Sequence, residues 1–304
     1  MERNVLITGS ASGLGREAVS LFAKRGYRVF AGVRRAEDAD KVARLHPSVT
    51  PVLLDVADPQ QVAAAAELVD RACGPAGLAV LINAAASNLY GPVEHTTRAE
   101  AVSLFQVVIF GPVELSNLML PALKRFSSSG AGRAKVLNVT SWASLDAGPF
   151  VGFYAAAKAA LLRLTEAQYF ELARFDVDAI AVVPGLMRTP FITKVEGQIG
   201  QTMARLSPQG REDYGAGLEH MASMSRGAGQ NPLAASPEKV ARQMLAIAEK
   251  RRPRSRYNLG LDTALVRLMN LALPFRLLKA MKMALFGLNR GKERRLSMAV
   301  AAQR

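Results

Sequence analysis

The chain has 304 residues, of which 50% are hydrophobic, so one α/β domain with a carboxyl-terminal extension accounts for it better than two independent domains. Its single cysteine, Cys73, excludes an internal disulfide and fits a cytoplasmic location. Three scattered histidines give no ligand-like spacing, so we expect no metal site. No stretch approaches about 18 uncharged apolar residues, and strand residues begin too early for a signal peptide, so we expect neither a membrane-spanning helix nor a leader.

The amino-terminal segment predicts a dinucleotide-binding turn. Residues 5–8 read as a short apolar strand, a loop with Gly9, Gly13 and Gly15 follows, and a helical pattern runs over 16–25. The spacing Gly-x-x-x-Gly-x-Gly differs from the commoner Gly-x-Gly-x-x-Gly. Glycines here let the backbone turn sharply and approach a pyrophosphate, whose charge is favoured by the free N–H groups and the positive end of the helix.

The second predicted strand, residues 27–33, ends in Arg34 and Arg35. In dinucleotide folds an acidic residue at this place holds the ribose hydroxyls of NAD, whereas arginine suits the 2′-phosphate of NADP. No acid occurs before Glu37, so we expect NADP (NADPH) in preference to NAD. The alternative is a pair of arginines on a solvated strand end.

Further strands alternate with helices, which is typical of a parallel sheet with right-handed crossovers. We predict a Rossmann-like, doubly wound α/β sheet of about seven parallel strands in a domain over residues 1–260, with ligands beyond the carboxyl ends of the strands. The remaining strands are expected at residues 51–56, 78–83, 135–140, 177–183 and 256–260, and helices at about 97–125, after 153 and at 236–249.

Tyr154 and Lys158 lie at i and i+4, so on a helix their side chains share one face. A tyrosine hydroxyl, with a pKa of about 10, is normally too weak an acid for exchange at neutral pH. A fixed ammonium group lowers that pKa and makes the phenol a candidate acid or base. Ser141, which ends a predicted strand 13 residues earlier, is placed to hold the same substrate oxygen.

Together these motifs resemble the short-chain dehydrogenase/reductase (SDR) family, which carries Thr-Gly-x-x-x-Gly-x-Gly near its amino terminus and Ser, then Tyr-x-x-x-Lys, near mid-chain. The resemblance covers roughly residues 3–260. Ser236-Pro-Glu-x-Val, followed by Arg256-Tyr, is similar to the branch that contains estradiol-type hydroxysteroid and retinol dehydrogenases.

The resemblance implies roles for individual residues. Ser141, Tyr154 and Lys158 become the catalytic residues. Asp55 and Val56 fall at the adenine pocket, although Asp55 has the alternative of capping a helix for which Asp58 is the better candidate. The implied cofactor-binding residues are Thr8, Gly9, Ser10, Ser12, Gly13, Leu14, Gly15, Arg34, Arg35, Asp55, Val56, Asn83, Tyr154, Lys158, Pro184, Gly185 and Thr189.

Two positions depart from the family pattern. The family has Asn-Ala-Gly where this chain has Asn83-Ala-Ala85, and it has an asparagine, which anchors a proton-relay water, where this chain has Val108. A valine side chain cannot hold that water. Either backbone carbonyls and Lys158 hold it, or the chemistry is altered or lost.

Residues 190–235 fit no regular pattern and contain many glycines and methionines. A long irregular segment of this kind is typical of a lid, and methionine suits an adaptable apolar lining. We expect it to cover an apolar small-molecule substrate, although plain core packing is the alternative for each side chain. The candidate substrate residues are Trp142, Phe150, Met187, Phe191 and His220.

The helix after residue 153 is rich in alanine, which allows close helix packing. The resemblance implies that this helix and the preceding long one form a subunit interface. We therefore expect a homodimer or homotetramer. Packing against its own sheet accounts for only one face of the helix.

The carboxyl-terminal extension, residues 261–304, is strongly basic. From residue 250 onward there are 14 basic and 2 acidic residues, and 275–288 has apolar and cationic faces at helical spacing. Such a helix either lies on an anionic membrane surface, as in a peripheral membrane protein, or docks over the substrate cleft. Without a recognised nucleic-acid-binding module we expect no nucleic acid partner.

The sequence thus predicts an NADP-preferring oxidoreductase that interconverts a secondary alcohol and a ketone, or an aldehyde, on an apolar molecule. Tyr154 would transfer the proton, Lys158 would tune it and bind the nicotinamide ribose, and Ser141 would steady the carbonyl oxygen. The alternative is an NADP(H)-binding protein with weak or altered catalysis, in a sensor or accessory role, because of Val108.

Overall fold

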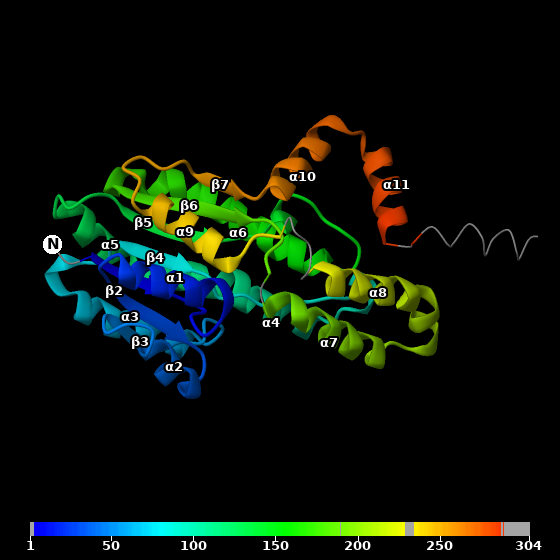
Figure 1. Ribbon diagram of the computed structural model, residues 1–304, viewed down its shortest axis with the longest axis horizontal. Coiled ribbons are helices and arrows are strands. Elements are labelled where there is room, and N and C mark those ends of the chain that lie inside the picture. Colours follow the sequence, from blue (N-terminus) through cyan, green and yellow to red (C-terminus); the bar gives the residue numbers. More distant parts are fainter. Residues whose placement is uncertain (1–2, 189, 229–233, 287, 289–304) are drawn as a thin grey trace, which may run out of the picture.

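The computed structural model describes residues 3–188, 190–228, 234–286 and 288 (Figure 1). Over these residues the strands form a seven-stranded, wholly parallel sheet in the order β3-β2-β1-β4-β5-β6-β7. The strands are β1 (Arg3–Ile7), β2 (Tyr27–Val33), β3 (Val49–Leu53), β4 (Val80–Asn83), β5 (Ala134–Val139), β6 (Val177–Pro184) and β7 (Arg256–Leu259).

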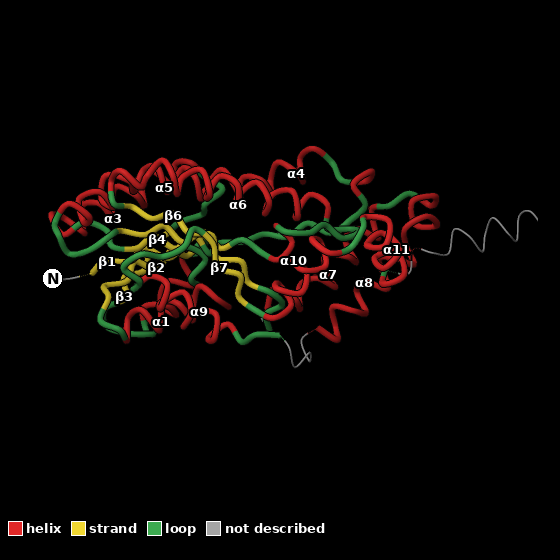
Figure 2. Tube along the Cα trace, turned by 90° about the horizontal axis from the view of Figure 1, so that it is seen from above, coloured by secondary structure: helices red, strands yellow, loops and turns green. Residues whose placement is uncertain are grey.

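Helices cover both faces of this sheet (Figure 2). Helices α3, α5 and α6 lie on one face, and α1 and α9 pack together on the other. Both faces are therefore dry, and the central strands are continuous apolar runs such as Val5-Leu6-Ile7, each fully buried. The helices are α1 (Gly13–Lys24), α2 (Ala39–Ala43), α3 (Pro59–Cys73), α4 (Arg98–Phe105), α5 (Gly111–Ser128), α6 (Gly152–Leu172), α7 (Pro190–Arg205), α8 (Pro208–Ala228), α9 (Pro237–Ala248), α10 (Leu261–Ala272) and α11 (Phe275–Leu285).

The predicted fold class is confirmed. The strand order reverses between β1 and β4, which is the switch point where doubly wound sheets bind ligands. Helices α7, α8, α10 and α11 lie beyond the carboxyl ends of the strands, at the right of Figure 1. The site is thus enclosed by the sheet edge on one side and by these helices on the other.

Local sequence signals set several helix starts. The Asp58 carboxylate accepts hydrogen bonds from the backbone N–H groups of Gln60 and Gln61, and Pro59 stands at the first helical position of α3. Ser236 caps α9 by accepting from the backbone N–H of Lys239. Asp58, and not Asp55, is therefore the cap of α3.

Residues 190–235 correct the sequence prediction, because most of this segment is helical. Helices α7 and α8 pack against each other. Val195, Ile199 and Leu206, at helical spacing, are buried in an apolar cluster with Leu218 and Ala222 of α8. This burial outweighs the low helix propensity of the interspersed glycines.

One helical segment bears on the expectation of no membrane-spanning helix. Within the described residues, the continuous helical segment Arg98–Ser128 is long and apolar enough to cross a membrane by length and composition alone. A search for uncharged stretches missed it because Glu114 interrupts the apolar run. Nearly half of its most apolar 18-residue window is buried inside the protein, and Leu104, Leu115 and Met119 are among the buried residues of the segment. A core helix passes the same test.

Candidate active site

A cavity of about 1580 Å³ opens at the carboxyl edge of the sheet. Its floor comes from the segments that follow β1, β2, β4, β5 and β6, and its outer wall from α7, α8, α10 and α11. The cavity is continuous from the amino-terminal glycine turn to the carboxyl-terminal helices. One chamber can therefore hold a dinucleotide and a second molecule side by side.

The glycine turn follows β1 and has no room for side chains. Gly9 and Gly13 have φ of +69° and +56°, in the left-handed region that favours glycine. A Cβ on Gly15 would lie 2.3 Å from the Gly9 carbonyl oxygen, and one on Gly9 would lie 2.8 Å from Cα of Ala85. The turn thus packs backbone against backbone, which allows a phosphate to approach the backbone closely at the start of α1. Gly9, Ser12, Gly13, Leu14 and Gly15 all line the cavity.

Thr8, Ser10 and Asn83 are buried, and none of them lines the cavity. The Thr8 hydroxyl oxygen accepts from the backbone N–H groups of Ala84 and Ala85, both at 3.0 Å, and the Ser10 hydroxyl donates to the Ile7 carbonyl. These contacts shape the glycine turn and the loop after β4 from beneath. The side chains of Thr8 and Ser10 therefore support the cavity floor and do not face a cofactor.

The Asn83 side chain is likewise hydrogen-bonded inside the protein. Its amide nitrogen donates to the Asn138 side-chain oxygen at 2.7 Å and to the Ser116 hydroxyl at 3.1 Å. Asn138 in turn donates to the Thr165 hydroxyl at 2.9 Å. A buried polar chain thus ties β4 to α5, β5 and α6, and the Asn83 side chain is a structural tie.

Arg34 and Arg35 line the cavity at the end of β2, together with Asp38. Arg35 pairs with Glu37 at 3.0 Å, and Asp38 pairs with Lys41 at 2.9 Å. Among the described residues no carboxylate pairs with Arg34. Arg34 is therefore the cation best placed to meet an anionic group at this end, opposite Asp55 and Val56 on the β3 side.

The three predicted catalytic residues converge on the middle of the cavity. Ser141 follows β5, and Tyr154 and Lys158 lie one turn apart on α6. The Ser141 hydroxyl hydrogen-bonds the Tyr154 phenol, and the Lys158 ammonium donates to the Val139 carbonyl at 2.9 Å. The end of β5 therefore holds the hydroxyl that bonds the phenol and, through the Val139 carbonyl, the amine one turn farther along α6.

The pKa values correct the expected electrostatics. Burial raises the pKa of Tyr154 to about 12, although the hydrogen bond from Ser141 opposes the shift. Burial also lowers the pKa of Lys158 to about 8, because an ammonium group loses hydration inside the protein. The sequence argument assumed that the ammonium dominates the phenol, but desolvation acts on both groups and keeps the phenol protonated.

Val108 is buried in a π-helical turn, Gln106–Phe110, that joins α4 to α5. Its apolar cluster contains Ala157, with Tyr154 packed against it. A π turn interrupts the regular hydrogen-bond ladder of a helix and is frequent at functional sites. The side-chain amide of the family is thus replaced by an apolar contact in a segment with irregular backbone bonding.

Asp262 holds the loop that follows β6, a contact that sequence analysis missed. The carboxylate of Asp262, in the first turn of α10, accepts from the backbone N–H of Leu186 at 2.5 Å. A Cβ on Gly185 would lie 2.0 Å from this carboxylate. Pro184 and Gly185 line the cavity, and Thr189 lies outside the described residues. No local pattern predicts this contact, because it joins residues 76 positions apart.

The predicted substrate residues divide into two groups. Trp142 and Met187 line the cavity, whereas Phe150 packs into the cluster between α7 and α8. His220 does not line the cavity, because its ring bonds the Leu285 carbonyl at 2.8 Å. The Phe191 side chain lies outside the described residues. Segment 190–235, which was expected to cover the substrate, contributes Gln198, Met221 and Met224 to the cavity wall. Sequence analysis did not name the further lining residues Tyr90, Val266, Met269, Leu278 and Met281.

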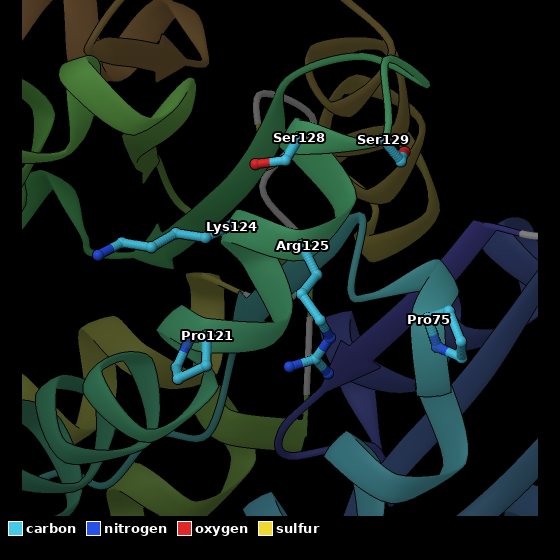
Figure 3. Close-up of a pocket in the computed structure, with 6 residues that line it drawn as sticks. All are labelled: Pro75, Pro121, Lys124, Arg125, Ser128 and Ser129. Carbon is cyan, nitrogen blue, oxygen red and sulfur yellow. The ribbon is translucent and has the colours of Figure 1, made fainter.

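A second hollow, of about 570 Å³, lies beside α5 (Figure 3). Lys124 and Arg125 line it, but in Figure 3 their side chains point apart. Lys124 lies 3.5 Å from the centre of the Phe175 ring, and Arg125 pairs with Asp70. Both cations already have partners, and the hollow is smaller than the main cavity, so we take the main cavity as the candidate site.

Comparisons with known proteins agree with this geometry. The family model described as short chain dehydrogenase matches residues 3–199. Human "Retinol dehydrogenase 5" is 32% identical over 91% of this chain and 86% of its own length. A short-chain dehydrogenase structure from Streptomyces avermitilis has a TM-score of 0.72 at 24% identity and covers 96% of this chain and 98% of its own. Another, from Burkholderia cenocepacia in complex with NADP, has a TM-score of 0.69 at 25% identity and covers 93% and 98%.

The parallel sheet, the glycine turn and the Ser–Tyr–Lys set define an oxidoreductase of the dinucleotide-binding α/β class. The chain belongs to the short-chain dehydrogenase/reductase family. Within that family it resembles the retinol dehydrogenase branch.

Proposed function

We propose that this protein uses NADP(H) to interconvert a secondary alcohol and a ketone, or an aldehyde, on an apolar small molecule. One observation carries the proposal. Ser141, Tyr154 and Lys158 meet in the same cavity as the Gly9–Gly15 turn, so a proton donor and a dinucleotide site share one chamber. The apolar substrate class is supported by Met221, Met224 and Met269 on the outer wall.

The residues of the cavity fit a dinucleotide. The glycine turn leaves space for a pyrophosphate at the start of α1, and Arg34, which pairs with no carboxylate of the described residues, offers its guanidinium group to a 2′-phosphate. The NADP bound in the Burkholderia relative supports the same choice. When bound, NADPH supplies the hydride. The ribose would lie near Lys158, and the Pro184–Gly185 loop would pass the nicotinamide.

The proton would come from Tyr154. Because burial holds the pKa of this phenol near 12, the phenol is protonated at neutral pH and serves as the acid during carbonyl reduction. Ser141 would donate to the same carbonyl oxygen and fix its position. Lys158, charged below about pH 8, would stabilise the phenolate that forms as the proton leaves.

Substrate-dependent NADPH oxidation tests this proposal. A panel of apolar ketones and aldehydes should include turned-over compounds, and Tyr154→Phe should lower their turnover by about 10²- to 10⁴-fold. Tyr169→Phe is a matched control, since it is the same substitution on the same helix outside the cavity. Equal turnover in wild type and Tyr154→Phe would refute the assignment of the acid.

A second candidate function, cofactor binding with weak or altered catalysis, is favoured by Val108. This side chain puts an apolar group beside Tyr154 where the family has an amide. The irregular backbone of the π turn supports instead a relay through carbonyl groups. Tight NADPH binding with no turnover anywhere in the panel would favour the second candidate over the first.

We also propose a cytoplasmic protein that binds anionic membrane surfaces peripherally. Helix α10 exposes Leu261, Leu265, Leu268 and Leu271, next to the cationic side chains of α11. Such a surface matches an acyl boundary flanked by phosphates. Wild type should pellet with anionic liposomes, and Leu268→Glu should reduce that pelleting. The absence of pelleting by wild type would remove this proposal.

The expected homodimer or homotetramer remains a proposal. The outer faces of α5 and α6 support it, because Leu118, Leu164 and Phe170 are exposed there. Large apolar side chains exposed on helix surfaces are candidates for burial in a subunit interface. Analytical ultracentrifugation should give a mass of two or four chains, and a monomer at every concentration would contradict it.

A further inference from the structure

Two buried carbonyl oxygens in the wall of the cavity have no hydrogen-bond donor. They are Oδ1 of Asn88, in the loop after β4, and Oε1 of Gln198, on α7. No group of the described chain donates to either atom. Buried side-chain oxygens are normally satisfied, so each orphaned acceptor calls for an explanation.

The fold brings these two residues into the same part of the wall. Thr202 lies one turn after Gln198, so the two side chains share a face of α7. The Thr202 hydroxyl donates to the backbone carbonyl of Tyr90 at 2.7 Å. Asn88 stands two residues before Tyr90 in this tethered loop. The Thr202 contact therefore fastens the segment that carries one orphaned oxygen to the segment that carries the other.

This part of the wall lies near the catalytic phenol. Tyr90 also lines the cavity. Burial raises the pKa of its phenol, and the nearby Tyr154 raises it further. A molecule whose carbonyl group meets Tyr154 thus extends toward Asn88 and Gln198. The surrounding wall, with Val195 and Met221, is apolar.

Position in the cavity separates this pair from the other orphaned oxygens. Those of Asn4, Asn83 and Asn258 belong to residues that do not line the cavity. No ligand in the chamber can reach them from the wall. Asn88 and Gln198 are the described residues that combine an unpaired buried acceptor with access to the chamber.

We infer that Asn88 and Gln198 form a polar subsite for a hydroxyl group of the substrate, separate from the carbonyl group that reacts. The inference rests on the proposed function for the reacting carbonyl. It narrows the substrate class to apolar carbonyl compounds, or the corresponding alcohols, that carry a further hydrogen-bond donor. A hydroxyl placed at the pair satisfies acceptors that an all-hydrocarbon substrate leaves unpaired.

Binding of matched ketones to the full-length protein with NADPH tests this inference. The probes are methyl nonyl ketone, its monohydroxy derivatives with the hydroxyl at successive chain positions, and the methyl ether of the derivative that binds most tightly. By calorimetry, at least one hydroxy derivative should bind about tenfold more tightly than the parent ketone. The ether accepts but cannot donate, so it should bind no more tightly than the parent.

The preference should disappear when the acceptors are removed. Asn88→Leu and Gln198→Met should each bring the ratio of the two dissociation constants toward one. Gln201→Met is the matched control, because Gln201 is exposed on the same helix, and it should keep the wild-type ratio. Unchanged NADPH binding in each variant verifies folding.

Three outcomes overturn the inference. In the first, wild type binds no hydroxy ketone more tightly than the parent ketone. In the second, the methyl ether binds as tightly as the hydroxy ketone. In the third, both Asn88→Leu and Gln198→Met keep the wild-type preference. Water that satisfies the two oxygens in the complex gives the first outcome. Turnover is a separate readout: preferential binding without NADPH oxidation supports the subsite and counts against the proposed reaction.

Discussion

The cofactor half and the substrate half of the cavity are held together by different kinds of contact. Around Gly9 and Gly15 the backbone itself sets the shape, and one added methyl group has no space. Around α7, α8, α10 and α11, flexible methionine and leucine side chains form the wall. The first half tolerates almost no change in volume, whereas the second half can be rebuilt around another ligand.

Alanine at two glycines gives the largest contrast between the halves. Gly15→Ala places a Cβ against the Gly9 carbonyl, so we expect a loss of about 1–3 kcal/mol in the free energy of unfolding and NADPH binding weakened more than tenfold. Gly200→Ala, in α7, meets open space and should stabilise the protein by about 0.5–1 kcal/mol. Urea unfolding and fluorescence titration with NADPH measure both effects.

Changes of opposite sign in the free energy of unfolding would confirm that the two halves differ in how tightly they are packed. If Gly15→Ala binds NADPH as wild type does, the turn is not the rigid cradle described above. If Gly200→Ala destabilises the protein, α7 is more tightly packed than its surroundings indicate.

Lys158, at the junction of the halves, gives a smaller effect that depends on pH. The folded protein releases the Lys158 proton near pH 8, whereas the unfolded chain keeps it to about pH 10.4. Between these values the unfolded state binds more protons, so the free energy of unfolding should rise with pH. Relative to Lys158→Met, wild type should gain roughly 2 kcal/mol between pH 8 and 10.

Chemical denaturation of both proteins across this pH range provides the measurement. Above about pH 10 the raised pKa of Tyr154 acts in the opposite direction, because the folded state then keeps a proton that the unfolded state has lost. Parallel stability curves for wild type and Lys158→Met would show that the amine is hydrated in the folded protein.

Cofactor selectivity is expected to give the smallest effect. Arg34→Ala should weaken NADPH binding about tenfold and leave NADH binding unchanged, because only NADPH carries the 2′-phosphate. Arg35→Ala should have less effect, since Glu37 already pairs with Arg35 at 3.0 Å. Tighter binding of NADH than of NADPH by wild type would contradict the assignment of Arg34.

The cofactor half could largely be predicted from sequence, because its determinants are local. The apolar run before Gly9, the arginines after β2 and the i, i+4 spacing of Tyr154 and Lys158 each lie within a few residues. Strand ends were correct to within a few residues, and the alternation of strands and helices predicted the parallel sheet.

The substrate half was harder to predict, because long-range packing decides it. The glycines in this segment prevented the prediction of α7 and α8, although Val195, Ile199 and Leu206 are at helical spacing. His220 was expected in the pocket, but it bonds the Leu285 carbonyl, 65 residues away. The expected acidity of Tyr154 failed because spacing alone does not reveal burial.

Asp262 joins the carboxyl-terminal extension to the wall of the main cavity. The first turn of α10 holds the loop at Gly185, so displacement of the extension also frees a loop that lines the main cavity. The position of the extension and the position of this cavity-lining loop are therefore coupled through Asp262. Truncation before residue 262 is therefore expected to lower turnover, even though Ser141, Tyr154 and Lys158 all stay in the chain.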